Sequence, residues 1–349
     1  MFLHRILLTA VISGFAFSAS AQSKNYEVAA VAFYNFENLF DTEDDPNNWG
    51  DDEFLPTGPY RYDETVYQQK LTNLATVISQ LGSELTPDGP AILGTTEVEN
   101  ARVLTDLARH PLIAHRNYQV IHFDSRDSRG IDVGLLYNPV YFKVLSARPL
   151  LVDISGQDGK GGRTRDVLFV HGILAGDTIS VLVNHWPSRR GGESASAPLR
   201  AIAAAVNRVT IDSLMRHAPS KVIIMGDFND DPTDPSITKV LGASGDRKNL
   251  KTGGVYNPFV SFYKKGIGTS AYNDSWGLFD QIMLTEPLVN SEETRWKYYK
   301  AEVFNKEFLK NKFGRWKGYP LRSFDNNNWQ NGYSDHFPAV VYLVRAAQP

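Results

Sequence analysis

The stretch KVIIMGDFND, residues 221–230, is the most informative part of the sequence. Its apolar run, 222–225, has the length and β-branching of a buried strand. Asp227 and Asn229 follow two positions apart, and residues two apart on an extended backbone point to the same side. The strand is therefore predicted to present a carboxylate and an amide together at its carboxyl end. Such a pair can orient a water molecule and stabilise an oxyanion, although a plain Asp/Asn turn would have the same sequence.

Several other polar side chains stand beside predicted strands in the same way. They are carboxylates, amides and imidazoles, and each adjoins a short apolar run: Asn35, Glu37, Glu97, His185, Asp280, Asp335 and His336. One carboxylate at a strand end is common, but this many polar residues of these types is not. If the strand ends converge, they form an oxygen-rich cavity with two histidines on its rim.

The residue types in this set predict a hard divalent cation. Carboxylate and amide oxygens suit Mg²⁺, Mn²⁺ or Ca²⁺, whereas zinc prefers histidine and sulfur ligands in motifs such as HExxH, which the sequence lacks. A hard cation polarises a phosphoryl oxygen, and a histidine paired with a carboxylate serves as a base or stabilises a transition state. Hydrolysis of a phosphate ester needs these parts.

Short apolar runs alternate with polar connections from residue 28 onward, without an internal repeat. We expect strands at 28–35, 91–95, 118–123, 133–137, 168–174, 180–184, 222–226, 280–284 and 339–344, and helices at 67–81, 99–108 and 197–217. Strands both follow one another directly and alternate with helices. This mixture predicts an α/β fold with two packed sheets and helices outside.

The composition is that of a globular enzyme with a leader. The 349 residues are 42% hydrophobic and 21% charged, and residues 1–21 have the basic start, apolar run and small-residue cleavage site of a signal peptide. We therefore expect a periplasmic or secreted protein with one catalytic domain over 22–349, no transmembrane segment and a monomeric state. The chain has no cysteine, which excludes disulfides and thiolate chemistry. Its net charge of −3 disfavours a nucleic-acid substrate without excluding it.

Two further stretches allow more than one interpretation. The loop 41–61 is rich in acids, which could bind calcium, but it lacks EF-hand spacing and a solvated loop is favoured. Residues 296–317 alternate aromatic side chains with lysines, which could stack bases over a cationic surface, although packing over the sheet is favoured.

Seven motifs occur in order along the chain: FYNFENLF, LGTTEVEN, RGIDVGLLY, VNHWPSRR, GDFND, LFDQIM and YSDHFPAVVY. Together they resemble the endonuclease/exonuclease/phosphatase superfamily, over about residues 28–343. The likeness is greatest to secreted Bacteroidetes-type members. It implies a four-layer α/β/β/α sandwich of the deoxyribonuclease-I type, with two mixed sheets and helices outside.

The resemblance also implies a role for each motif residue. Asn35 and Glu97 would hold the metal, with Asp335 as a further ligand, and Glu99 is a rival for Glu97. Asp227 would orient the attacking water. The other catalytic residues would be His185 and Asn229 beside the phosphate, Asp280 as support, and the pair Asp335 and His336, in which the carboxylate orients the imidazole.

The substrate contacts implied by the resemblance are less specific. Arg129 is near the phosphate-contacting position of the family. Arg189 and Arg190 precede two glycines that would let a phosphate approach the backbone, or they are solvated charges.

These inferences predict a secreted, Mg²⁺-dependent phosphoesterase that cleaves phosphodiester bonds, with Mn²⁺ or Ca²⁺ as alternative ions. A nuclease acting on nucleic acid is the first expectation. A phospholipid or inositol-phosphate phosphoesterase is the alternative, and a non-catalytic binding module on the same fold is a weaker one.

Overall fold

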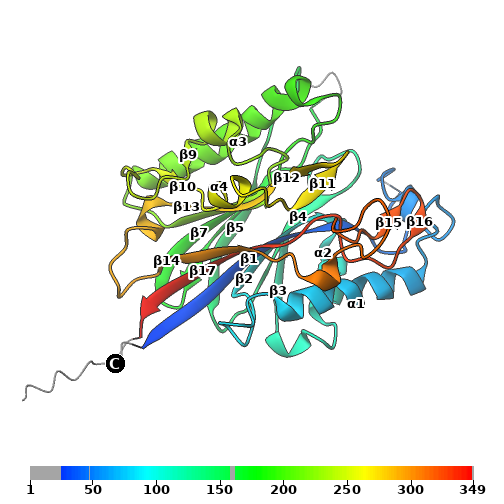
Figure 1. The fold of residues 1–349 in the computed structure, drawn as a ribbon, viewed down its shortest axis with the longest axis horizontal. Helices are drawn as coiled ribbons and strands as arrows, with labels where there is room; N and C mark the ends of the chain where they lie inside the picture. Colours follow the sequence, from blue (N-terminus) through cyan, green and yellow to red (C-terminus); the bar gives the residue numbers. More distant parts are fainter. Residues whose placement is uncertain (1–24, 47, 158–161, 348–349) are drawn as a thin grey trace, which may run out of the picture.

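The computed structural model describes residues 25–46, 48–157 and 162–347. The predicted signal peptide lies outside these residues. Two large mixed sheets pack against each other, with α3 on the outer side of one sheet and α1 and α2 on the outer side of the other (Figure 1). This arrangement confirms the predicted four-layer α/β sandwich.

The first sheet has six strands, with its two longest strands, β17 and β1, near one edge. Its order is β14 (Lys297–Val303), β17 (Ala339–Ala346), β1 (Tyr26–Leu39), β2 (Ile92–Val98), β4 (Asp132–Tyr137) and β3 (Gln119–His122). Only β1 and β2 pair in parallel, and Asn35 lies opposite Thr96 in their register.

The second sheet has seven strands and, like the first, one parallel pair of long strands. Its order is β5 (Phe142–Leu150), β6 (Val167–Leu174), β7 (Asp177–His185), β8 (Val222–Asp227), β13 (Asp280–Thr285), β10 (Val255–Tyr256) and β9 (Ala243–Ser244). Among the long strands, β7 and β8 are the parallel pair, with His185 opposite Asp227, and the antiparallel β13 places Asp280 opposite Asp227 on its other side. Because parallel strands end at the same edge, each sheet delivers two polar side chains there.

The central strand β8, which ends at Asp227, is buried on both of its faces. Ile223 and Met225 pack into the core between the sheets, whereas Val222 and Ile224 pack beneath α3 (Glu193–Met215). A strand that is buried on both faces has a continuous apolar sequence, and this explains the run VIIM at residues 222–225. The sheets approach closely, since a Cβ at Gly94 of β2 would lie 2.4 Å from the sulfur of Met225.

The helices begin at polar caps. Asp63 accepts a hydrogen bond from the amide of Val66 at the start of α1 (Glu64–Gln80), and Asn100 caps α2 (Ala101–Ala108). The remaining elements are short: α4 (Val260–Tyr263), the hairpins β11 (Ser270–Tyr272) with β12 (Ser275–Gly277) and β15 (Phe324–Asp325) with β16 (Asn328–Trp329), and the turns η1 (Asp52–Phe54), η2 (Ala114–Arg116), η3 (Ser236–Val240), η4 (Glu286–Leu288) and η5 (Glu307–Leu309).

Several elements differ from the sequence-based expectation, and three of them are long. Strands β5 and β14 were not among the expected strands. Helix α3 begins at Glu193, four residues before the expected start, and continues through Pro198. The guanidinium of Arg200 donates hydrogen bonds to the carbonyl of Glu193 and the hydroxyl of Ser196, which satisfies polar groups in the turn that the proline disturbs.

Candidate active site

The carboxylate of Asp227 lies at the centre of the converging strand ends. Its Oδ2 accepts a hydrogen bond from Nδ2 of Asn35 at 3.2 Å, and its Oδ1 accepts one from the backbone N–H of Asn229 at 2.9 Å. One contact comes from each sheet. Burial raises the pKa of Asp227 to about 7, against the opposing effect of the nearby His336. A carboxylate with this pKa can accept a proton near neutral pH.

Asn229 is not in the extended conformation that the opening motif predicts. Strand β8 ends at Asp227, and Asn229 has a left-handed backbone with φ of 49°. Its side-chain amide donates a hydrogen bond to the carbonyl of Trp186, 3.0 Å away. The ring of Phe228 packs edge-on against Trp186 with centroids 4.7 Å apart, so the turn is anchored in the core beneath α3.

His336 is held by Asp280. Its Nδ1 lies 2.6 Å from Oδ2 of Asp280, whereas its Nε2 lies 3.9 Å from Oδ1 of Asp335. The expected orienting role of Asp335 is therefore wrong for this hydrogen bond, because β13 brings Asp280 to the imidazole while Asp335 turns to Arg322 at 3.1 Å. Burial alone would lower the pKa of His336, but Asp280 and the neighbouring Asp227 raise it well above its ordinary value. These two carboxylates thus favour the protonated form of His336.

His185, in contrast to His336, favours the neutral form of its imidazole. Its Nδ1 shares a hydrogen bond of 2.6 Å with the hydroxyl of Thr96 at the end of β2. Burial, together with the positive charges of Arg165 and Arg129, lowers the pKa of His185 well below its ordinary value. The site therefore contains one neutral and one protonated histidine, a division of roles that environment rather than residue type creates.

Glu97 and its rival Glu99 point to different places. The carboxylate of Glu97 lines the cavity and lies 3.9 Å from Nε2 of His185. That of Glu99 is buried and accepts a hydrogen bond from the backbone of Asp41 at 2.7 Å. Burial, with a smaller contribution from the nearby acids, raises the pKa of Glu99 to about 8. Only Glu97 faces the other predicted site residues.

Four residues near this edge have a backbone conformation that is uncommon for residues with a Cβ. Glu37, Asn38, Glu97 and Asn229 all have left-handed conformations, with φ between 49° and 59°. Such conformations are costly for residues with a Cβ, and persist where the surroundings enforce them, most often at functional sites.

A cleft of about 730 Å³ opens from these residues. Glu97, His185, Asp227, Asn229 and His336 lie at one end of it. Its other walls carry cationic and apolar side chains, including Arg129, Arg163, Arg190, Ile154 and Leu199. Asn35, Asp280 and Asp335 do not line the cleft; Asn35 and Asp280 are fully buried behind it and Asp335 is partly exposed beside Arg322.

The three predicted substrate arginines differ in their surroundings. Arg129 and Arg190 line the cleft. Arg189 does not: its guanidinium bonds to the carbonyl of Asn229 and to the carboxylates of Glu193, Asp231 and Asp234. With these partners Arg189 supports the turn after β8, and the geometry gives no support for a substrate contact.

Sequence reasoning did not single out several residues that support the site. Thr96 contacts His185, and Arg165 bonds to the carbonyls of His185 and Trp186. Arg322 bridges Asp335 and Glu37, the latter being a strand-end acid that the sequence analysis noted without a role. Thr96 is the position opposite Asn35, which strand pairing could have indicated, but Arg322 comes from a loop with no motif.

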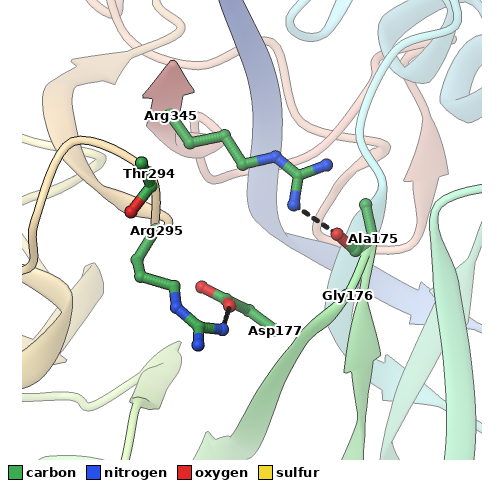
Figure 2. A pocket seen from close by; sticks show the side chains of 6 residues that line it. All are labelled: Ala175, Gly176, Asp177, Thr294, Arg295 and Arg345. Carbon is green, nitrogen blue, oxygen red and sulfur yellow. Dashed lines mark hydrogen bonds and ion pairs between the residues drawn. The ribbon is translucent and has the colours of Figure 1, made fainter. Parts of the chain in front are cut away.

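A second hollow, of about 380 Å³, lies at the opposite ends of the strands. Its side chains satisfy one another: Arg295 pairs with Asp177 at 2.6 Å and Arg345 bonds to the carbonyl of Ala175 (Figure 2). The charged side chains of this hollow are therefore paired with protein groups.

Among the helices of the described residues, none has both the length and the apolar character that a bilayer crossing requires.

The comparisons with known proteins agree with this geometry. Solved structures with the same fold include an endonuclease/exonuclease/phosphatase family protein from Bacteroides thetaiotaomicron, with TM-score 0.55 and 16% identity over 93% of this chain and 100% of that one. A mannosyl-6-phosphatase from the same organism matches with TM-score 0.53 and 16% identity, over 90% and 99% of the two chains. D. rerio TDP2 complexed with a single-strand DNA product matches with TM-score 0.53 and 14% identity, over 90% and 98%.

No curated protein matches the chain. The profile of the Endonuclease/Exonuclease/phosphatase family, however, matches residues 30–345, nearly all of the described part. The chain therefore belongs to the endonuclease/exonuclease/phosphatase family, whose members are phosphoester hydrolases.

Proposed function

We propose that the protein hydrolyses phosphate esters with the help of a divalent cation held near Glu97. The observation that carries this proposal is the convergence of Asp227, His185 and His336 on one cleft with three distinct environments. Asp227 has a pKa near neutrality, His336 is protonated and His185 is neutral. A base, a cation and a neutral hydrogen-bonding group are what attack by water on a phosphate requires.

The donor set around Glu97 fits a divalent cation. Glu97 receives a backbone hydrogen bond from Asn38, and in the described part of the chain its only side-chain nitrogen within ion-pair distance belongs to the neutral His185. A carboxylate that faces a cleft without a cationic partner is a natural metal ligand. By contrast, the cluster of Asp227, Asp280 and His336, whose ligand atoms lie within 4.8 Å of one another, already contains its own positive charge.

Each residue then has a defined task. Asp227 orients the attacking water and accepts its proton, while Asn35 and Asn229 fix the direction of the carboxylate. The imidazolium of His336 stabilises the charge that develops on the phosphate, and Asp280 holds the ring in place. A divalent cation held by Glu97 would supply polarisation of a phosphoryl oxygen. Asn35 and Asp335, which the resemblance adds as ligands, do not line the cleft, so Glu97 is the ligand that the geometry supports.

Nucleic acid is the first candidate substrate. It is the class that the sequence motifs predict, and the DNA-bound TDP2 shares the fold. A compact phosphate ester is the second candidate, favoured by one observation: among the described residues, those that line the cleft include arginines but no Phe, Tyr or Trp. Proteins that hold single-stranded nucleic acid usually offer aromatic rings on which bases stack.

The decisive assay compares substrate classes and metal dependence together. The purified protein is treated with a chelator, then given Mg²⁺, Mn²⁺ or Ca²⁺ and assayed on plasmid DNA, a single-stranded oligonucleotide, sphingomyelin and a hexose 6-phosphate. We expect activity only after a metal is restored, and near-complete loss in Asp227→Ala and His336→Ala. Full activity of Asp227→Ala, or undiminished turnover in chelator, would contradict the mechanism; turnover of the sugar phosphate alone would remove the nuclease assignment.

A further inference from the structure

The loop that joins β1 to α1 gathers three carboxylates outside the active site. Asp44, Asp51 and Asp52 each offer an oxygen, and these oxygens all lie within 4.8 Å of one another. Asp44 and Asp52 are exposed, whereas Asp51 is 2% exposed. Three acids this close repel one another in the absence of a cation.

Asp51 has a carboxylate oxygen without a partner. Its Oδ2 accepts a hydrogen bond from the backbone N–H of Asp45 at 2.8 Å, but its Oδ1 is buried and has none. A buried charge is costly unless it is paired or coordinates a metal.

Arg102, a basic residue of α2 near this loop, is paired with other acids. Arg102 pairs with Glu43 at 2.5 Å and lies 3.8 Å from Asp41. Across the described residues, no Lys, Arg or His forms an ion pair with Asp44, Asp51 or Asp52. The cluster therefore has an excess of negative charge that only a ligand from solution can offset.

We propose that Asp44, Asp51 and Asp52 bind a calcium ion. All three donors are carboxylate oxygens, which excludes a preference for zinc or copper. Calcium accepts irregular oxygen cages completed by backbone carbonyls and water, whereas magnesium demands near-octahedral geometry. An irregular loop without EF-hand spacing suits calcium better.

The position of the loop gives the ion a consequence for the active site. A Cβ at Gly50 would lie 2.2 Å from the carbonyl oxygen of Arg129, and one at Gly130 would lie 1.7 Å from the side chain of Asn48. The acidic loop thus packs directly on the turn that carries Arg129 into the cleft. An ion held by Asp44, Asp51 and Asp52 would also fix the turn that holds this arginine.

Terbium luminescence tests the site, because Tb³⁺ occupies calcium sites and Trp49, 85% exposed and two residues from Asp51, can sensitise it. The background is the full chain with Glu97→Gln, which removes the metal ligand proposed for the active site. In that background, Glu53→Gln is the matched control, since it removes an exposed charge of the same loop outside the cluster. We expect saturable, calcium-displaceable luminescence in the control and at least a tenfold weaker affinity in Asp51→Asn.

Thermal unfolding supplies the second measurement. Calcium should raise the Tm of the control by a few degrees and leave that of Asp51→Asn unchanged. If Asp51→Asn does not fold, Asp52→Asn, at an exposed position, replaces it in both measurements. Terbium affinity and a calcium-dependent Tm in these variants equal to those of Glu53→Gln would overturn the proposal.

Discussion

The Nδ1 atom of His336 lies 2.6 Å from Oδ2 of Asp280, and the two residues are 56 positions apart in the chain. Asp280 is fully buried at the start of β13, opposite Asp227. This contact makes His336 a cation, because an adjacent buried carboxylate favours the protonated imidazole.

The pH profile should reveal this pair. If the imidazolium is the active form, kcat/KM falls as pH rises through the raised pKa of His336, so the alkaline limb lies above the ordinary histidine value. Asp280→Asn removes the charge that raises this pKa and should move the limb to lower pH. The measurement is kcat/KM across pH 5–10 at saturating Mg²⁺. An alkaline limb at the same pH in wild type and variant would refute the assignment.

Replacing Glu97 should strongly reduce metal-dependent turnover. Glu97→Gln keeps the shape but removes the charge that faces the cleft, and we expect a loss of kcat/KM on the order of 100-fold, the usual effect of removing one preorganised stabilising group. Titration with Mg²⁺ measures the accompanying rise in the concentration for half-maximal activity.

Glu99→Gln is the matched control, two residues away. Its carboxylate is buried against the backbone of Asp41 and has a raised pKa. We expect activity within about twofold of wild type, because the variant changes no group in the cleft. Equal losses in both variants would leave no reason to prefer Glu97.

The adjacent arginines Arg189 and Arg190 should separate stability from binding. Arg189→Ala leaves acids of the turn after β8 without their cation, so the free energy of unfolding should fall by about 2 kcal/mol. Arg190→Ala should leave the Tm unchanged and raise KM about tenfold, which corresponds to roughly 1.4 kcal/mol of lost binding. Urea unfolding and steady-state kinetics on both variants distinguish these outcomes, and a reversed pattern would contradict the geometry.

Lys70 should make stability increase with pH. It is fully buried, and its ammonium donates hydrogen bonds to the carbonyl of Glu37 and the hydroxyl of Ser323. Burial lowers its pKa from 10.5 to about 8 in the folded protein. Between these values the unfolded chain binds more protons than the native one, so the free energy of unfolding rises with pH.

The matched comparison is Lys70→Met. From pH 8 to 10, the stability of wild type relative to the variant should increase by up to about 2 kcal/mol, since one pKa unit corresponds to about 1.4 kcal/mol. Urea unfolding at both pH values gives the difference. A constant difference would show that Lys70 titrates as it does in the unfolded chain.

The sequence predicted what depends on local pattern. The apolar runs before Asn35, Glu97, His185 and Asp227 indicated their strands, and parallel pairing then brought these residues to one edge. Strand β5 was not predicted, because it lies at a sheet edge with most of its residues exposed and contains Pro149.

The partner of His336 could not be obtained in the same way. Asp335 is adjacent in sequence, but the choice of Asp280 depends on the register of β13 against β8 and on the loop that carries His336. Ser334 sets that loop by donating a hydrogen bond to the carbonyl of Asn35 and accepting one from the amide of His336. Contacts between distant strands and loops follow from three-dimensional packing, which a linear pattern does not encode.

The division of the site between the two sheets has a consequence for how the enzyme loses activity under denaturing conditions. Asn35 and Glu97 belong to one sheet, and His185 and Asp227 to the other; the contact of Gly94 with Met225 shows that side-chain packing joins the sheets there. Backbone hydrogen bonds hold each sheet together, so a slight shift between the sheets would separate the catalytic groups while both sheets stay intact. Heat or urea should therefore inactivate the protein before its circular dichroism changes.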